Sequence, residues 1–267
     1  MEIPTEKRKA ISVNPNMMII YGLPKVGKTS ICAGLENHLI AELESGGADY
    51  VDARVMEINK ATHFNDLLKE IKSSDTQVCD YLVVDTITRL DEYSEIVGTY
   101  LYMNKSVGSK FNWASESDEN IIIKTGKRLR HTDPEFETVH EIPNGYGYQY
   151  SRQIMNNWYS ALAELVALGK VKHIILLAHV KDKFLESKTG ELVTSIELNL
   201  TGKVKGIYSS KVDAIAYFVR KGDKGYLSFE NKDKVICGGR CDHLQGKILI
   251  SEKNGKSLKT HWDKIYI

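Results

Sequence analysis

The feature that most constrains this chain is a glycine- and lysine-containing loop that directly follows a short apolar run. Residues Met17 to Tyr21 are continuously apolar, and the eight residues after them read Gly-Leu-Pro-Lys-Val-Gly-Lys-Thr. An apolar run of this length predicts a strand that is buried on both faces. Glycines at the first and sixth positions of the loop let successive backbone N–H groups point inward at an anion. The segment Gly22 to Thr29 therefore predicts a phosphate-binding loop between a strand and a helix.

Three side chains complete a nucleotide site in this interpretation. Lys28 places a full positive charge beside the β- and γ-phosphates, and the Thr29 hydroxyl is a ligand for Mg²⁺. Asp85 ends the apolar run 81–84, where a carboxylate can hold a magnesium-bound water against the loop. An N-cap of the next helix is the alternative role for Asp85. ATP and Mg²⁺ are the expected cofactors, and the residues expected to contact the nucleotide are Gly22, Leu23, Pro24, Lys25, Val26, Gly27, Lys28, Thr29 and Ser30.

The pattern of apolar residues predicts an α/β fold. The spacing of Ile31, Leu35 and Leu39 predicts a helix from about Lys28 to the glycine pair at 46–47, and residues 50–58 follow as a strand region. Further helices are expected after Thr62, around 90–101 and around 154–168, and strands at 81–84, 171–178 and 213–219. This alternation favours a mostly parallel sheet covered by helices. The expected organisation is a lead-in at 1–15, a core at 16–220 with an irregular region at 104–150, and β-hairpins at 221–267 within the same domain.

Composition limits the partners and the compartment. Lys and Arg total 36 against 35 Asp and Glu, so any nucleic-acid surface must be a local patch. No apolar run approaches the roughly 20 residues that span a membrane, and the N-terminus lacks the apolar stretch of a signal peptide. We therefore expect a cytoplasmic protein with no membrane partner. Cys237 and Cys241 have no second cysteine pair to complete a zinc site, so we expect reduced thiols.

Several segments together resemble the RecA-like ATPases, and more closely the AAA-domain proteins of phages that act in single-strand annealing and recombination. A guanine-reading Asn-Lys-x-Asp box and the Leu-Ser-Gly-Gly-Gln run of transport ATPases do not occur in the sequence. The resemblance covers about residues 11–250. The segments that carry it are Tyr-Gly-Leu-Pro-Lys-Val-Gly-Lys-Thr-Ser, Tyr-Leu-Val-Val-Asp-Thr-Ile-Thr, Ile-Pro-Asn-Gly-Tyr-Gly-Tyr, Ile-Leu-Leu-Ala-His-Val-Lys-Asp-Lys, Leu-Thr-Gly-Lys and Cys-Gly-Gly-Arg.

The resemblance implies roles for further residues. His179 would be the polar sensor of the γ-phosphate. A RecA-like enzyme also presents a glutamate at the end of the strand after the P-loop helix, and the candidates here are Asp52 and, slightly favoured, Glu57. Neither lies in the family's usual Asp-Thr-Glu run, so an ordinary surface acid remains an alternative for both. Lys203 and Lys205 are candidates to reach the γ-phosphate of a neighbouring subunit in a ring or filament, or else they are solvated charges.

In RecA-like proteins the loops after the Walker B helix and after the sensor strand line the DNA path, and the matching regions are 104–150 and 180–199. Cations there would follow phosphates while tyrosines stack on bases, as single-strand binding without sequence readout requires. Packed tyrosines and a solvated basic face are the alternative. The DNA-binding candidates are Lys124, Lys127, Arg128, Arg130, Tyr146, Tyr148, Lys181 and Lys183.

The expected function is thus ATP hydrolysis coupled to single-stranded DNA in phage recombination, annealing or replication, with other proteins of those processes as possible partners. One alternative is an ATP-switched scaffold or helicase loader with little hydrolysis. The other is a small-molecule phosphotransferase, in which the basic run 124–130 would form a lid.

Overall fold

A computed structural model of the 267-residue chain describes residues 12–113, 135–186, 192–231, 235–255 and 257–267. The described strands are β1 (Met17–Gly22), β2 (His38–Glu42), β3 (Val55–Glu57), β4 (Cys79–Asp85), β5 (Val171–Glu186), β6 (Leu192–Leu198), β7 (Ala214–Lys221), β8 (Lys224–Ser228), β9 (Gly238–Gly239), β10 (Lys247–Asn254) and β11 (Ser257–Thr260). The α-helices are α1 (Lys28–Cys32), α2 (Ala61–Ser73), α3 (Ile87–Met103), α5 (Tyr148–Ala167) and α6 (Gly202–Lys211). Short 3₁₀ turns lie at Gly108–Lys110, Val139–Glu141, Pro143–Gly145 and Trp262–Lys264.

One large, mostly parallel sheet organises the described chain. Its strand order is β11-β10-β8-β7-β1-β5-β4-β2-β3, and the strands from β7 to β3 run parallel to their neighbours. β5 therefore lies between the strand that precedes the phosphate loop and the strand that ends at Asp85. β8, β10 and β11 continue the same sheet as antiparallel hairpins. The predicted RecA-like α/β class with C-terminal hairpins is confirmed.

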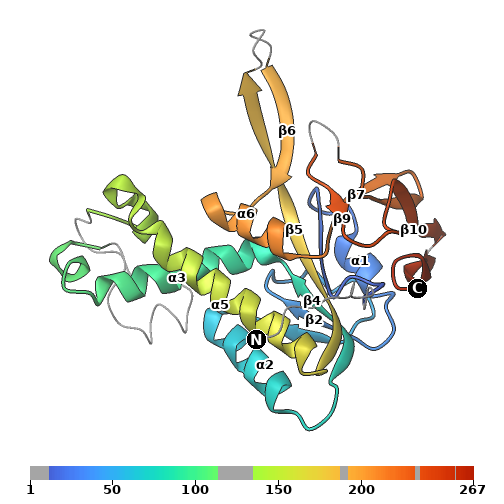
Figure 1. Cartoon of the computed structure of the whole chain (residues 1–267), viewed down its shortest axis with the longest axis horizontal. Coiled ribbons are helices and arrows are strands. Elements are labelled where there is room, and N and C mark those ends of the chain that lie inside the picture. Colours follow the sequence, from blue (N-terminus) through green and yellow to red (C-terminus); the bar gives the residue numbers. More distant parts are fainter. Residues whose placement is uncertain (1–11, 114–134, 187–191, 232–234, 256) are drawn as a thin grey trace, which may run out of the picture.

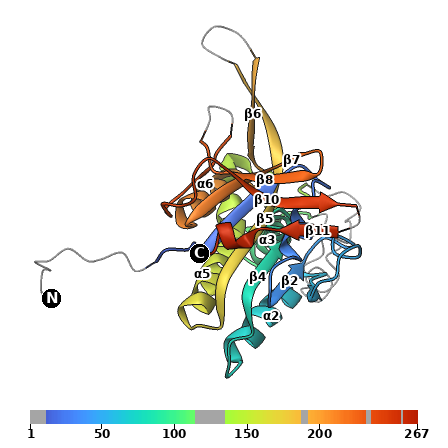
Figure 2. The ribbon, with the colours of Figure 1, turned by 90° about the vertical axis from the view of Figure 1, so that its right-hand side faces the viewer.

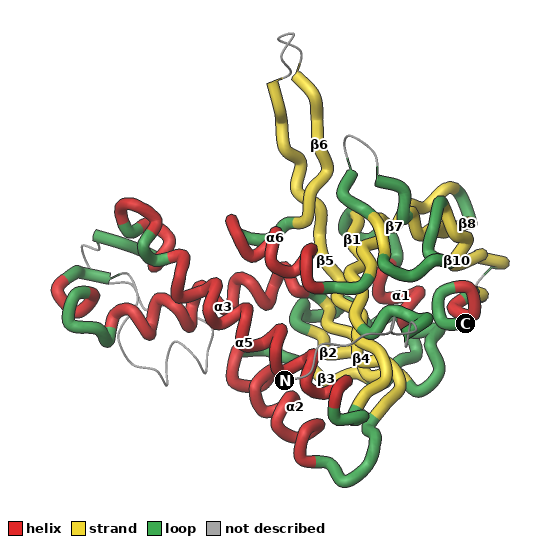
Figure 3. Tube along the Cα trace, in the orientation of Figure 1, coloured by secondary structure: helices red, strands yellow, loops and turns green. Residues whose placement is uncertain are grey.

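Two layers of core cover the two faces of this sheet, and the alternation along β1 assigns each residue to a face. The helices α2 and α5 lie on one side of the strands and α1 on the other (Figures 1 and 3). Ile19 and Tyr21 pack with residues of α2, α3, α5 and α6 in the larger core. Met18 and Ile20 face the other way, where they pack with residues of α1 and with Trp262 and Ile265 of the C-terminal segment. Because β1 is wholly buried on both faces, the phosphate loop starts from a rigid strand.

The predicted long helix after Lys28 is wrong. α1 ends at Cys32, and residues 38–42 form β2, which pairs with β4. Asn37 has a φ of 47°, a left-handed turn that redirects the chain into β2. A Cβ on Gly34 would approach Thr260 Oγ1 to 2.5 Å, so the C-terminal strand crosses directly beside the point where the helix has ended. Leu39 thus belongs to a buried strand, although its spacing fitted a helix.

The other helices and strands differ less from those predicted from the sequence. α2 begins at Ala61 with Lys60 as its N-cap, and only residues 55–57 of the expected 50–58 strand pair with β2. β5 continues past His179 and forms a hairpin with β6, which projects from the body of the molecule (Figures 1 and 2). α6 was not predicted, because its sequence lacks a clear apolar stripe. None of the helices among the described residues combines the length and apolar composition needed to cross a membrane.

Candidate functional site

The loop between β1 and α1 has the backbone of an anion cradle. Lys25 and Gly27 both have positive φ, 59° and 104°, which curls the backbone before α1 begins at Lys28. A Cβ on Gly22 would approach the carbonyl oxygen of Phe218 to 2.9 Å, so only glycine fits where the loop leaves β1 beside β7. The two glycines singled out in the sequence therefore have different physical reasons, close approach at one and left-handed backbone at the other.

The Lys28 ammonium is held inside this cradle. Its side chain is buried, and Nζ donates to the carbonyl oxygens of Gly22 at 3.1 Å and Leu23 at 2.9 Å. Burial lowers the pKa of Lys28, while the nearby carboxylates of Asp85 and Glu44 act in the opposite direction. The charge thus lies at the mouth of the loop, surrounded by backbone dipoles and by two acids from neighbouring strands.

Thr29 and Asp85 meet as the sequence predicts. The Thr29 hydroxyl donates to Oδ2 of Asp85 at 2.6 Å, and burial raises the pKa of this carboxyl. The N-cap of α3 is Thr86, whose side chain accepts from the backbone N–H of Arg89. The alternative role of Asp85 as the helix cap is therefore wrong, and its carboxylate faces the phosphate loop.

A glutamate that the sequence analysis missed completes the group. Glu44 follows β2, and His179 Nε2 donates to its two carboxylate oxygens at 2.8 and 3.0 Å. The Thr86 hydroxyl donates to the same carboxylate at 2.7 Å. The hydrogen bond from His179, followed by that from Thr86, lowers the pKa of Glu44. The backbone N–H of His179 donates to Oγ1 of Thr88 at 3.0 Å, which ties the end of the parallel part of β5 to the start of α3.

The structure does not bring the two predicted base candidates to this group. Glu57 lies on the outermost parallel strand β3, pairs in register with Glu42, and is exposed. No hydrogen bond or ion pair among the described residues joins it to Lys28, Asp85 or His179. Asp52 lies on the loop between β2 and β3 beside a cavity described below. The reason is that the sequence analysis missed strand β2, because the acids at the end of that strand are Glu42 and Glu44.

Glu42 and Glu44 lie in different surroundings. Oε1 of Glu42 accepts from the backbone N–H of Ala48 at 2.6 Å, so this buried carboxylate fixes the loop that follows β2. Glu44 instead faces His179 and retains 40% of its side-chain exposure. An acid that is ionised, partly solvated and close to Lys28 has the properties of a group that handles water.

The donor set fits a magnesium–nucleotide complex. The cradle offers curled backbone N–H groups and a buried ammonium for phosphate oxygens, while a hydroxyl and a carboxylate in direct contact match the oxygen ligands that Mg²⁺ prefers. The first turn of α1 contains no acidic residue that would repel phosphate. The residues that would hold the metal are Thr29 and Asp85.

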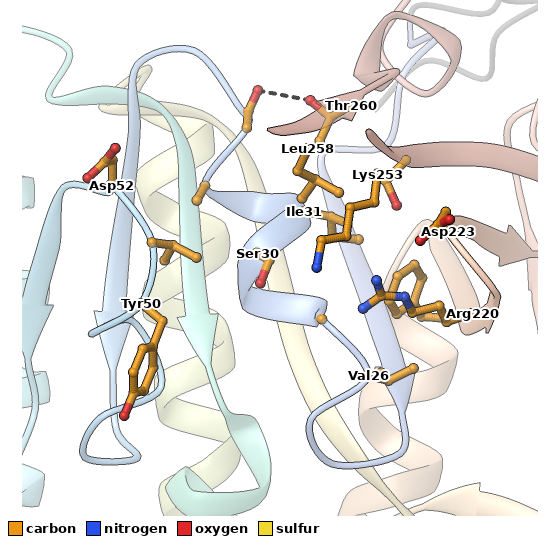
Figure 4. Close-up of a pocket in the computed structure, with 16 residues that line it drawn as sticks. Val26, Ser30, Ile31, Tyr50, Asp52, Arg220, Asp223, Lys253, Leu258 and Thr260 are labelled. Carbon is orange, nitrogen blue, oxygen red and sulfur yellow. Dashed lines mark hydrogen bonds between the residues drawn. The ribbon is translucent and has the colours of Figure 1, made fainter. Parts of the chain in front are cut away.

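A cavity of about 430 Å³ extends from the loop along α1 towards the C-terminal hairpins (Figure 4). Gly27 and Ser30 form its end nearest the phosphate cradle. Tyr50 lies on one side, and Arg220 and Lys253 lie on the other. Its position next to the cradle and its mixed polar and apolar wall suit the nucleoside part of a nucleotide.

A second cavity, of about 360 Å³, lies where the N-termini of α5 and α6 meet. Tyr148 and Arg152 of α5 and Lys203 of α6 line it. The Tyr148 ring stacks on His140, with centroids 4.2 Å apart and planes at 7°. The buried Asp91 carboxylate of α3 accepts from the backbone N–H of Thr201 at 2.6 Å, which ties the start of α6 to the helix that follows Asp85.

The remaining predicted residues are scattered. Tyr146 is 64% exposed, and Lys181 is exposed on β5. Lys183 lies on β5 with its backbone opposite Ser195, and Lys205 forms an ion pair with Glu197. The basic candidates Lys124, Lys127, Arg128 and Arg130 lie outside the described residues. Cys237 is buried next to the Tyr21 hydroxyl, and no group of potential metal ligands with three or more members occurs in the described ranges.

The strand order and the loop define the class of protein. A phosphate loop between β1 and α1, an acid at the end of β4 and a polar residue, His179, at the end of the parallel part of the intervening strand β5 make this chain a RecA-like P-loop protein.

The sequence comparison identifies the family. The model of a family described as an AAA domain matches residues 14–241, and the chain belongs to this family. A search of curated proteins gives no match. Among solved structures, the chain is similar to the RadB recombinase (9% identity, TM-score 0.44) and to the flagellar accessory protein FlaH from Methanocaldococcus jannaschii (11% identity, TM-score 0.41). Each similarity covers 93% of this chain and 92% of the other.

Proposed function

We propose that this chain binds and hydrolyses ATP in the presence of Mg²⁺. The observation that carries the proposal is the meeting of Lys28, Asp85 and Glu44 at one edge of the parallel sheet, from three separate segments of the chain. Lys28 and the loop N–H groups would hold the phosphates. When bound at Thr29 and Asp85, Mg²⁺ would neutralise charge that develops on the phosphate oxygens.

Glu44 takes the role of the general base in this proposal, in place of Glu57. The hydrogen bonds that it accepts favour its ionised form, and its partial exposure lets water reach it. The carboxylate would orient the attacking water and accept its proton. His179 contacts this carboxylate and also precedes the β5–β6 hairpin, so it would carry the state of the phosphate site to that hairpin.

The cavity next to Gly27 and Ser30 would hold the nucleoside. Tyr50 is 92% exposed at its wall, as a side chain that stacks on a ligand base would be. Arg220 and Lys253 lie on the opposite wall and would add positive charge near the ribose and the α-phosphate.

We further propose that the cavity between α5 and α6 binds single-stranded DNA. Arg152 and Lys203 would contact a backbone phosphate, and the exposed side of Tyr148, whose other side packs on His140, would stack on a base. The 20-residue helix α5 starts beside the same cavity, and the positive end of its dipole would favour a phosphate there. Lys181 and Lys183 on the projecting hairpin would extend this path.

The proposed biological role is the handling of single-stranded DNA in phage recombination, annealing or replication. Assembly into a ring or filament would give Lys203 an alternative role, in which it reaches a neighbouring subunit's nucleotide instead of a DNA phosphate. Lys205 is the weaker candidate for that task, because Glu197 already pairs with it. The location in the host cytoplasm and the contact with other recombination proteins remain part of this proposal.

Phosphate release from ATP tests the proposal directly, measured with and without Mg²⁺ and with and without single-stranded DNA. We expect Mg²⁺-dependent turnover that DNA increases, and Lys28→Ala should abolish both turnover and the binding of a fluorescent ATP analogue. Lys69→Ala, on the exposed side of α2, is the matched control. Saturable ATP binding without hydrolysis would instead favour a switched scaffold, an outcome compatible with the engagement of Glu44 by His179 and Thr86. Phosphate transfer to a small molecule without DNA stimulation would favour a phosphotransferase.

A further inference from the structure

Thr86 occupies a position that the mechanism proposed above does not use. It is 1% exposed, it is the N-cap of α3, and it directly follows Asp85 on the chain. Its hydroxyl makes two hydrogen bonds of opposite sense. Oγ1 accepts from the backbone N–H of Arg89 at 3.2 Å and donates to Oε1 of Glu44 at 2.7 Å.

These two bonds determine where the hydroxyl proton points. A threonine hydroxyl has one proton and two lone pairs. Because the N–H of Arg89 occupies one lone pair, and because a carboxylate can only accept, the single proton is directed at Glu44. The helix cap therefore orients the hydroxyl as a donor to the carboxylate before any substrate binds.

The carboxylate of Glu44 is thereby held from two directions. His179 Nε2 approaches from β5, and Thr86 approaches from the first turn of α3. Both bonds reach Oε1, whereas Oε2 receives only the longer bond from His179, at 3.0 Å. With one donor alone, a partly exposed glutamate would rotate about its terminal torsion, which is a soft one. With two donors on different elements, the plane of the carboxylate is fixed and Oε2 is left as the more available acceptor for water.

We infer that Thr86 is a positioning residue for the general base of ATP hydrolysis. It acts through Glu44 and contacts neither the phosphates nor the attacking water. The inference rests on the proposed function, since it requires Glu44 to act on water. Thr86 directly follows Asp85 on the chain. The same short segment therefore supplies the carboxylate for the metal and orients the general base.

Three substitutions at this position separate the positioning role from helix capping. Thr86→Ser keeps both hydrogen bonds. Thr86→Gly removes the hydroxyl but remains a good N-cap, and Thr86→Val keeps the shape while losing both the cap and the donor. We expect the Gly and Val variants to lower kcat about tenfold, the order of effect of losing one hydrogen bond to a charged group, with the KM for ATP changed less than twofold. The Ser variant should retain kcat within about twofold.

Affinity for a fluorescent ATP analogue and the Tm of each variant accompany the kinetics. Wild-type-like affinity in the Gly variant together with lost kcat supports the inference, even if the Val variant fails to fold. A Gly variant with full kcat overturns it and assigns Thr86 to capping alone. A Ser variant as slow as the Gly variant also overturns it. If the wild-type chain hydrolyses no ATP, the proposed function fails as well, whereas a wild type that hydrolyses ATP with an indifferent position 86 refutes this inference alone.

Discussion

The two ends of the parallel strands each have a polar cluster built from similar residues, yet only one of them has the properties of a site. At the amino ends, Asp80 of β4 accepts from Asn37, Gln77 and Lys172. At the carboxyl ends, Asp85 of the same strand contacts Thr29, and Glu44 contacts His179. Both clusters include a carboxylate whose pKa the hydrogen bonds of its partners lower, Asp80 at one end and Glu44 at the other.

The difference lies in what surrounds the charges. The Asp80 carboxylate pairs with a half-exposed lysine at the surface, and its three donors occupy both of its oxygens. At the other end a buried ammonium and curled backbone N–H groups face two acids, so the group offers both donors and acceptors to a ligand. Helices begin just beyond the carboxyl ends of parallel strands, and the positive ends of their dipoles favour anionic ligands there. Similar residues therefore form a structural cluster at one end and a candidate site at the other.

A substitution of the proposed base at the carboxyl ends should have the strongest effect on activity. Glu44→Gln should lower kcat by at least about 100-fold while leaving nucleotide affinity nearly unchanged, because the amide cannot accept the proton. Glu57→Gln on the outer strand should leave kcat within about twofold. Steady-state phosphate release measures both. Equal losses in the two variants, or a loss only at Glu57, would restore the base that the sequence analysis favoured.

Single-stranded DNA binding should depend on the cavity between α5 and α6. α5 and α6 run back along the sheet, so both helices start near the carboxyl ends of the strands. The combination Arg152→Ala with Lys203→Ala should weaken single-stranded DNA binding about tenfold and reduce its salt dependence by about one ion per lost contact. Fluorescence anisotropy across a salt series measures this. Lys224→Ala, on β8, should have no effect, and equal weakening in that control would contradict the assignment.

A smaller effect is expected at the nucleoside cavity. Tyr50→Ala should raise the KM for ATP about fivefold with little change in kcat, because stacking contributes to binding and not to the chemical step. Tyr146→Ala removes another exposed tyrosine and is the control in assays without DNA. An unchanged KM in the Tyr50 variant would place the base elsewhere.

The smallest effect is expected at the amino ends and concerns stability. Hydrogen bonding to Lys172 lowers the pKa of Asp80 below its ordinary value of 3.8. The stabilisation is therefore complete above pH 3.8 and is lost as the pH falls through the lower pKa of the folded state. Asp80→Asn should lower Tm at neutral pH by no more than about 2 °C, and the two melting curves should converge in acid. A constant difference down to the acid range would show that the charge of Asp80 is not the cause.

The parts of the candidate site that could be predicted from the sequence are those whose pattern lies within one short segment of the chain. The phosphate loop and Asp85 each directly follow a short apolar strand, so their neighbours on the chain identify them. His179 also follows an apolar run, but its role was assigned only through the resemblance to RecA-like ATPases. The parallel order of their strands brings them together without further information.

The sequence analysis did not identify Glu44, because its role can be recognised only when the end of strand β2 is known. Ile31, Leu35 and Leu39 match a helical period, and nothing local reveals that the C-terminal strand passes beside Gly34 where α1 has already ended. The acidic pair Glu42 and Glu44 was the available signal, since it follows four residues of which three are apolar. The cavity between α5 and α6 was beyond sequence reasoning in a different way, because α6 has no apolar stripe and Arg152 meets Lys203 only through tertiary packing.

One pair of variants on a single strand tests the central claim that the carboxyl ends perform the chemistry. Asp85→Asn and Asp80→Asn make the same substitution at opposite ends of β4. The Mg²⁺-dependent rate of ATP hydrolysis should fall by at least about 100-fold in the first variant and stay within about twofold of the wild type in the second. Full activity in Asp85→Asn, or an equal loss in both variants, would contradict this account.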